Sequence, residues 1–192
     1  MTMEQTNYII SALTAKGVEF DPGLTNDEVS DVETKFAFHF PPDLRLFLQT
    51  SLPASAGFVH WRLGLASKAK ANNIIARLNQ PLEGALFDVK YNSELWYTMW
   101  GPKPATHEER VSIVKQHYAA CPRLIPVYSH RFLPDRPNEV GNPVYSVHQT
   151  DIIYYGYDLA SYFAKEFRFS LPSFFQPTKH PKIIEFWNGY TE

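Results

Sequence analysis

Hydrophobic residues recur at helical spacing in six stretches of the chain. The clearest stretch follows Thr25, which lies three residues before Glu28, the spacing of a capping box in which each side chain bonds a free backbone amide. Val29, Val32 and Phe36 then repeat at i, i+3 and i+7, so a helix is expected from Thr25 to about Phe36. The same reasoning predicts helices over residues 3–16, 42–48, 67–78, 106–121 and 158–167.

Strand signals gather in the second half of the chain. Three short runs are rich in β-branched and aromatic residues and are bounded by turn residues: "RLIPVYS", "NPVYSV" and "DIIYYG". One earlier strand is expected at residues 57–64, where "GFVHWRLG" alternates in part and ends in glycine. Helices at the start and flanks, with strands gathered from the middle onwards, predict an α+β fold with a mainly antiparallel sheet flanked by helices.

Prolines mark the segments that are expected to be irregular. The chain has 15 prolines in 192 residues, above the usual share of ~5%, which indicates short elements and many turns. Pro81, in "NQPLEG", is expected to end the helix that begins near residue 67. The aromatic stretch at 84–105 is then expected to be mainly loop, and "LPDRPNEVGN" at 133–142 is too rich in proline for regular structure.

Length and composition indicate a soluble globular protein. The 192 residues fit one domain, residues 1–192, with the helix over residues 3–16 either part of it or an appendage. The formal net charge of −2 provides no basic field for nucleic acid or an anionic membrane. We see neither a secretion signal nor about 18 consecutive apolar residues. The single cysteine, Cys121, excludes an internal disulfide, and together these features predict a cytoplasmic location.

Residues with catalytic chemistry are present, but they follow no catalytic motif. The seven histidines include no pair at i, i+4, and Cys121 has no nucleophile signature around it. No glycine-rich phosphate loop occurs either. We therefore expect no metal and no cofactor. A small-ligand-binding or hydrolytic domain is the alternative, with a pocket near His130, His148 and Asp151.

Aromatic residues make up 15% of the chain, and most of them are expected in the core. Trp, Tyr and Arg are also the residue types that anchor protein interfaces. Residues of these kinds in expected loops, with their polar neighbours, are the candidates for contact with a protein partner: Trp96, Tyr97, Trp100, His130, Arg131, Asp135 and Arg136. The alternative is that Trp96 and Trp100 belong to the core and that Arg131 pairs with a nearby acid.

Two blocks of the sequence show a recognisable order of motifs. The first block is "LTNDEVSDVETKFAFHFPPDLRLFL", with a capped helix, a Phe-Pro break and a Pro-Asp helix that ends in Phe-Leu. The second block runs from Leu124 to Phe167. Together these blocks resemble the SUKH superfamily, the Smi/Knr cell-wall-synthesis regulator family. The chain departs from the family pattern between them, because "SLPASAG" stands where the family has a Gly-Gly turn.

This resemblance implies an α+β fold and a binding role rather than catalysis. Many bacterial members look like immunity proteins that neutralise a toxin, often a nuclease, by direct contact, and fungal members are interaction proteins in wall synthesis. No common catalytic residues come with the family. We therefore expect a non-enzymatic protein-binding domain whose specific form is toxin immunity. A regulatory scaffold is the second alternative, beside the ligand-binding or hydrolytic domain.

Overall fold

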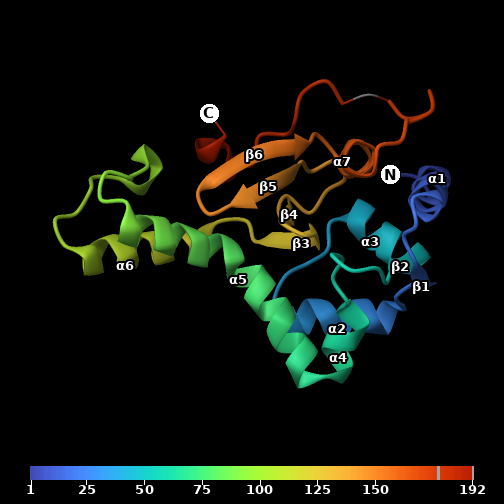
Figure 1. The fold of residues 1–192 in the computed structure, drawn as a ribbon, viewed down its shortest axis with the longest axis horizontal. Coiled ribbons are helices and arrows are strands. Elements are labelled where there is room, and N and C mark those ends of the chain that lie inside the picture. Colours follow the sequence, from blue (N-terminus) through green and yellow to red (C-terminus); the bar gives the residue numbers. More distant parts are fainter. Residues whose placement is uncertain (177, 192) are drawn as a thin grey trace.

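The centre of the protein is a four-stranded antiparallel sheet in an α+β fold (Figure 1). The computed structural model describes residues 1–176 and 178–191. The strands follow one another across the sheet in chain order: β3 (Leu124–Tyr128), β4 (Arg131–Pro134), β5 (Val144–His148) and β6 (Asp151–Gly156). The three strands expected in this half of the chain are confirmed. The fourth, β4, overlaps the stretch expected to be loop, and its Leu133 pairs with Ile125 of β3.

Both faces of this sheet are buried, and each face has its own hydrophobic core. Neighbouring residues in a strand point to opposite faces. Accordingly, Ile125 and Leu133 belong to the first core, whereas their neighbours Leu124 and Phe132 belong to the second. This double burial explains why all four residues of β4 are buried, including the charged Arg131.

Helices from both ends of the chain build the first core. They are α1 (Met3–Ala15), α2 (Asn26–Phe36), α3 (Pro42–Thr50), α4 (Trp61–Ala66) and α7 (Leu159–Phe167), with a two-stranded sheet of β1 (Phe20–Pro22) and β2 (Ser51–Pro53) beside them. The expected caps are present, because Thr25, Thr106 and Asp158 each accept a hydrogen bond from the third residue of the helix that they begin. Helix α1 is no loose appendage, since its Ile9 and Leu13 are fully buried and it packs against α3 and α7.

The prediction of a strand at residues 57–64 is wrong. Only Phe58 makes a β-bridge, to Tyr128, and α4 begins at Trp61. The indole of Trp61 is buried against the rings of Phe38 and Phe40, with centroids 5.6 and 5.3 Å away. This aromatic packing joins segments distant in sequence. It favours a helix at Trp61, although the partly alternating sequence pattern predicts a strand.

Pro81 does not end its helix, which is a second correction. Helix α5 (Lys68–Tyr91) continues through it and is 24 residues long. Its first half places Leu78 in the first core, and its second half places Ala85 and Val89 in the second core. Packing at both ends therefore outweighs the cost of about 3 kcal/mol for a proline inside a helix.

The second core is covered by α5, α6 (His107–Ala120) and two short 3₁₀ turns, η1 (Thr98–Trp100) and η2 (Trp187–Tyr190). Figure 1 shows α5 and α6 side by side, with the chain between them at the far end from α4. The phenol oxygens of Tyr118 in α6 and Tyr190 in η2 are 2.9 Å apart. The C-terminal residues thus close the second face of the sheet.

An ion pair between Glu28 and Arg62 joins α2 to α4, and it makes stability depend on pH. Glu28 bonds the amide of Thr25 at 2.8 Å and accepts from Arg62 Nη2 at 2.9 Å. The hydrogen bond from Arg62 is the main cause that lowers the pKa of Glu28 to about 2. A carboxylate with a lowered pKa stabilises the fold above its ordinary pKa of 4.5, and this stabilisation is lost as the pH falls towards 2.

We therefore expect Glu28→Gln to flatten the pH dependence of stability between about pH 4.5 and 2, because the variant has no carboxylate to protonate. The measurement is the free energy of unfolding from urea titrations at several pH values. Asp31→Asn, an exposed position on the same helix, is the matched control and should keep the slope of the wild type. An unchanged slope in Glu28→Gln would show that the ion pair does not act as described.

Candidate protein-binding groove

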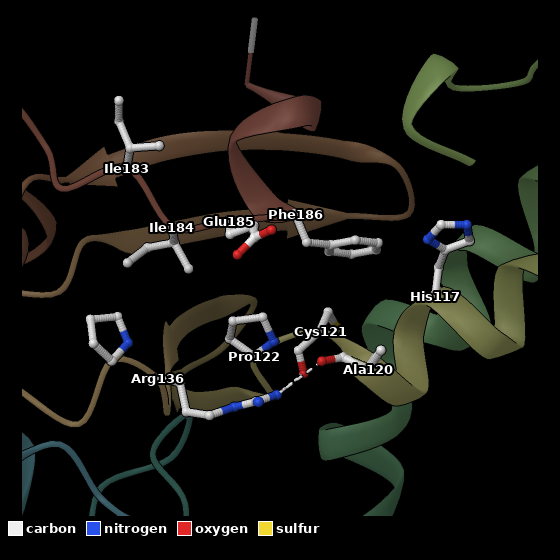
Figure 2. A pocket seen from close by; sticks show the side chains of 10 residues that line it. His117, Ala120, Cys121, Pro122, Arg136, Ile183, Ile184, Glu185 and Phe186 are labelled. Atoms are coloured by element: carbon white, nitrogen blue, oxygen red, sulfur yellow. Dashed lines mark hydrogen bonds between the residues drawn. The ribbon is translucent and has the colours of Figure 1, made fainter. Parts of the chain in front are cut away.

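Two adjoining hollows lie where α6 ends and β3 begins. The first, of about 540 Å³, lies between the end of α6 and the C-terminal segment 183–186, and Figure 2 shows its lining side chains. The second, of about 460 Å³, lies between the middle of α5, α6 and the start of β3. Cys121 and Arg136 line both hollows, so we treat them together as one open groove.

Arg136 lines both halves of the groove and is held in place by the end of α6. Its Nη2 donates to the carbonyl oxygens of Ala120 and Cys121, at 3.1 and 2.6 Å (Figure 2). A cation at this position is favourable, because the last carbonyls of a helix are unpaired and carry partial negative charge. The side chain is still 57% exposed. Arg136 therefore presents a fixed guanidinium to whatever occupies the groove.

Asp135 and Arg123 form the framework beneath this arginine. The backbone amide of Asp135 donates to the carbonyl of Arg123 at 2.8 Å, and its carboxylate accepts from the amide of Arg123 at 2.7 Å. The guanidinium of Arg123 donates in turn to the carbonyl of Phe36, the last residue of α2, at 2.6 Å. Burial raises the pKa of the Asp135 carboxyl, while these hydrogen bonds and Arg136 oppose the rise. The hydrogen bonds between Asp135 and Arg123 extend the β3–β4 ladder, and the bond from Arg123 to Phe36 connects α2 to the sheet.

The C-terminal segment gives the groove its apolar wall. Ile184 is buried beneath it, whereas its neighbour Ile183 is 78% exposed. Phe186 has a φ of +74°, the left-handed region that an aromatic residue rarely adopts. Its ring packs edge-on against Tyr118, and Trp187 donates from Nε1 to the carbonyl of Pro122 at 2.7 Å. The groove wall thus combines Ile183, whose side chain is exposed to solvent, with Phe186, whose backbone is strained.

The groove also contains the single cysteine of the chain. Burial raises the pKa of the Cys121 thiol to about 12, and its Sγ donates to the carbonyl of Tyr118. A thiol with this pKa is protonated at neutral pH and is a poor nucleophile. Cys121 therefore acts here as a small buried residue, the role that its sequence surroundings indicate.

The predicted contact residues lie in three separate places. Asp135 and Arg136 line the groove, whereas His130, in the turn between β3 and β4, and Arg131, at the start of β4, lie away from it. Trp96, Tyr97 and Trp100 pack together around η1, where the ring of Tyr97 also contacts Tyr190. Trp96 and Tyr97 keep part of their surface exposed. Trp100 is only 2% exposed, so its expected place at the surface is corrected to a place in the second core.

Arg131 is likewise a framework residue rather than a surface anchor. Its Nε donates to Glu166 of α7 at 2.8 Å and its Nη1 to Ser146 of β5 at 2.7 Å. The guanidinium also lies 3.7 Å from the centroid of the Tyr155 ring. The alternative in which Arg131 pairs with a nearby acid is confirmed. The expectation that Asp135 is a surface contact is corrected in the same way, because its side chain is largely buried and bonds the backbone of Arg123.

His130, His148 and Asp151 meet at one end of the sheet, but they line none of the five hollows described in residues 1–176 and 178–191. His148 and Asp151 are cross-strand partners and are both exposed. Burial lowers the pKa of His130, and the charge of Arg131 lowers it further. His148 and Asp151 thus lie on exposed strand ends and His130 in a partly buried turn, with no hollow between them among those described.

The groove residues missed in the sequence are Ile183 and Phe186. Their segment, "KIIEFWNGY", has two adjacent isoleucines. From the sequence, both isoleucines could belong to a buried strand or helix, so neither stands out as a surface residue. Only the structure shows that one faces inwards and the other outwards.

Comparison of the chain with family models, with curated proteins and with solved structures finds no match. Within the described part of the chain, the helices are too short or too polar to cross a membrane.

We expect Arg131→Ala to lower the free energy of unfolding by about 3 kcal/mol, because it leaves the carboxylate of Glu166 without its partner in a largely buried place. Urea unfolding measures the change. Lys115→Ala, an exposed position on α6, is the control and should change stability by less than about 0.5 kcal/mol. Equal stability of the two variants would show that Arg131 is not part of the framework.

Proposed function

We propose that this protein is a non-enzymatic protein-binding domain and that the groove beside Arg136 holds its partner. The observation that carries the proposal is the combination of groups around one open hollow: an isoleucine that is 78% exposed, an aromatic residue with a strained backbone and a fixed arginine. Aromatic and arginine side chains at the centre of a protein interface supply most of its binding energy.

The backbone of Phe186 supports a role for this segment beyond packing. A left-handed conformation at an aromatic residue costs of the order of 1–3 kcal/mol and persists only where its surroundings enforce it. Here it allows Ile184 and Trp187 to enter the second core while Ile183 stays outside. Such strain is concentrated at binding and catalytic sites in proteins, which agrees with a binding surface at this segment.

The charges of the groove indicate the kind of partner surface. Lys115, Arg123 and Arg136 line it, against Asp135 and Glu185, and the carboxylate of Asp135 is already bonded to backbone. A segment with an apolar side chain and a carboxylate fits this lining. We therefore expect contact with a neutral or acidic part of the partner.

Toxin immunity is the specific form that we propose for this binding. Its support is the resemblance of residues 24–48 and 124–167 to the SUKH superfamily, together with the α+β fold that this resemblance implies. A regulatory scaffold would use the same groove, and the number and identity of the partners distinguish the two forms. The ligand-binding or hydrolytic alternative has less support, since His148 and Asp151 lie on exposed strand ends.

We expect Ile183→Asp to weaken binding of the partner by about 30-fold, the loss of about 2 kcal/mol typical of an interface hot spot. The partner is first captured with tagged wild-type protein and identified by mass spectrometry, and its affinity for each variant is then measured by calorimetry. Ile75→Asp is the matched control, because Ile75 is 42% exposed on α5 and lies outside the groove.

Equal affinity of the partner for wild type and Ile183→Asp would overturn the assignment of the groove. The form of the function is tested separately, by expressing the captured protein with and without this one. Toxicity that wild type suppresses and Ile183→Asp does not suppress would support immunity. A harmless partner, or several unrelated partners bound at the groove, would support the scaffold instead.

A further inference from the structure

The two hollows of the groove differ in charge. The hollow between α5, α6 and the start of β3 is lined by three cationic side chains and one acidic side chain: Lys115, Arg123, Arg136 and Asp135. The hollow against the C-terminal segment is lined mainly by apolar residues, with Glu185 as the only carboxylate among them, and it shares Arg136. We therefore call the first hollow the cationic half of the groove and the second the apolar half.

The positive charge of the cationic half is only partly compensated within the fold. Asp135 offsets one charge, since its Oδ1 accepts from the amide of Arg123 at 2.7 Å and lies 3.6 Å from Nε of Arg136. The C-terminal ends of α2 and α6 also meet here. Arg123 donates to the carbonyl of Phe36 and Arg136 to that of Ala120. Because a helix C-terminus is equivalent to about half a negative charge, about one positive charge remains at this half of the groove.

Lys115 and Arg136 carry the part of this charge that a partner can reach. Lys115 is exposed on α6, and within residues 1–176 and 178–191 no salt bridge joins its ammonium group to a carboxylate. Arg136 uses Nη2 for the two backbone carbonyls at the end of α6, which leaves Nη1 of the same guanidinium without a hydrogen bond in this part of the chain. Both side chains can therefore donate to an incoming anion.

The size of the remaining charge indicates a single carboxylate as this anion. A carboxylate carries one negative charge and matches it. A phosphate group carries about −1.5 to −2 at pH 7 and would leave an excess of negative charge beside two helix C-termini. Carboxylates also form charge-assisted hydrogen bonds with lysine and arginine. An Asp or Glu side chain of a protein partner therefore fits the cationic half better than a phosphate does.

Glu185 fixes the direction in which a partner segment lies. Figure 2 shows its side chain between Ile184 and Phe186, on the wall opposite Arg136. An acidic side chain in the apolar half would lie near Glu185 and would be repelled by it. An apolar side chain there would instead cover the exposed Ile183 and gain from its burial. The acid and the apolar residue of a partner are thus directed to different halves of the groove.

We infer that the groove binds an extended segment of the partner with one acidic residue for the cationic half and one large apolar residue for the apolar half. The carboxylate accepts from Lys115 and Arg136, and the apolar side chain packs on Ile183. Hollows of these volumes are each about 10 Å across, so the two residues are separated by about two to four positions in an extended chain, which rises roughly 3.3 Å per residue. The segment belongs to the partner of the proposed function, on which this assignment rests.

The test selects short random peptides, displayed on phage, for binding to the full chain. We expect the recovered peptides to share an Asp or Glu about two to four positions from a large apolar residue. One such peptide is synthesised and its affinity is measured by calorimetry. Lys115→Glu should weaken its binding by about tenfold, because attraction is replaced by repulsion. Lys90→Glu, an exposed position on α5 outside the groove, is the matched control and should leave the affinity unchanged.

Two charge exchanges test the placement of the acid. A peptide in which lysine replaces the acid should bind Lys115→Glu more tightly than wild type. Glu185→Lys should remove the repulsion in the apolar half, so peptides selected against this variant should carry a second acid. Both positions are exposed, so both variants are expected to fold.

The outcomes separate this assignment from the groove itself. Peptides that lose affinity for Ile183→Asp but share no acid, or that bind wild type and Lys115→Glu equally, would leave the groove in place and overturn the acidic segment alone. Peptides that bind wild type and Ile183→Asp equally would overturn both, as would a selection that recovers no peptide. Inorganic phosphate is titrated alone as a further probe. Binding of phosphate that Lys115→Glu abolishes would indicate a site for free anions and would also overturn the acidic segment.

Discussion

The rest of this structure depends on one constraint, which is that the central sheet must be covered on both faces. Phe132 and Leu133 are adjacent in β4, both are fully buried, and they point to opposite sides. A chain of this size has few long helices with which to cover two faces. It covers the first face with helices from both ends of the chain and the second with α5, α6 and short turns rich in aromatic residues. Helix α5 serves both cores, and for this reason it is 24 residues long despite Pro81.

The groove is a consequence of this division into two cores. Leu78 belongs to the first core and Trp187 to the second, and both line the same hollow. The chain turns at Cys121 and Pro122 to pass from α6 into β3, and at this turn helices α2 and α6 both end. Arg123 bonds the last carbonyl of α2 and Arg136 bonds the end of α6. Two cations that stabilise helix ends are thereby concentrated at the junction where the two hollows lie.

Local signals in the sequence predict the capped helices of both cores well, because caps and periodic stripes lie within single segments. Thr25, Thr106 and Asp158 begin their helices as expected. The predictions fail where contacts between residues distant in sequence determine the local structure. Trp61 is helical because of rings that lie more than 20 residues away, and Pro81 is tolerated because both ends of its helix are packed. In the candidate site, residue type alone could not separate Arg131 from Arg136, since only the position of Glu166 in space makes the first a framework residue.

With both faces of the sheet covered, new contacts can form only at its two edges and on the segments that cover it. The β3 edge is closed by Pro126 and by the bridge to Phe58, and the exposed arginine and isoleucine of the groove lie beside the start of this strand. The β6 edge is covered as well, because Ile152 is only 1% exposed and η2 packs beside this strand. A partner at the groove would therefore bind through side chains rather than through the backbone hydrogen bonds of an open sheet edge.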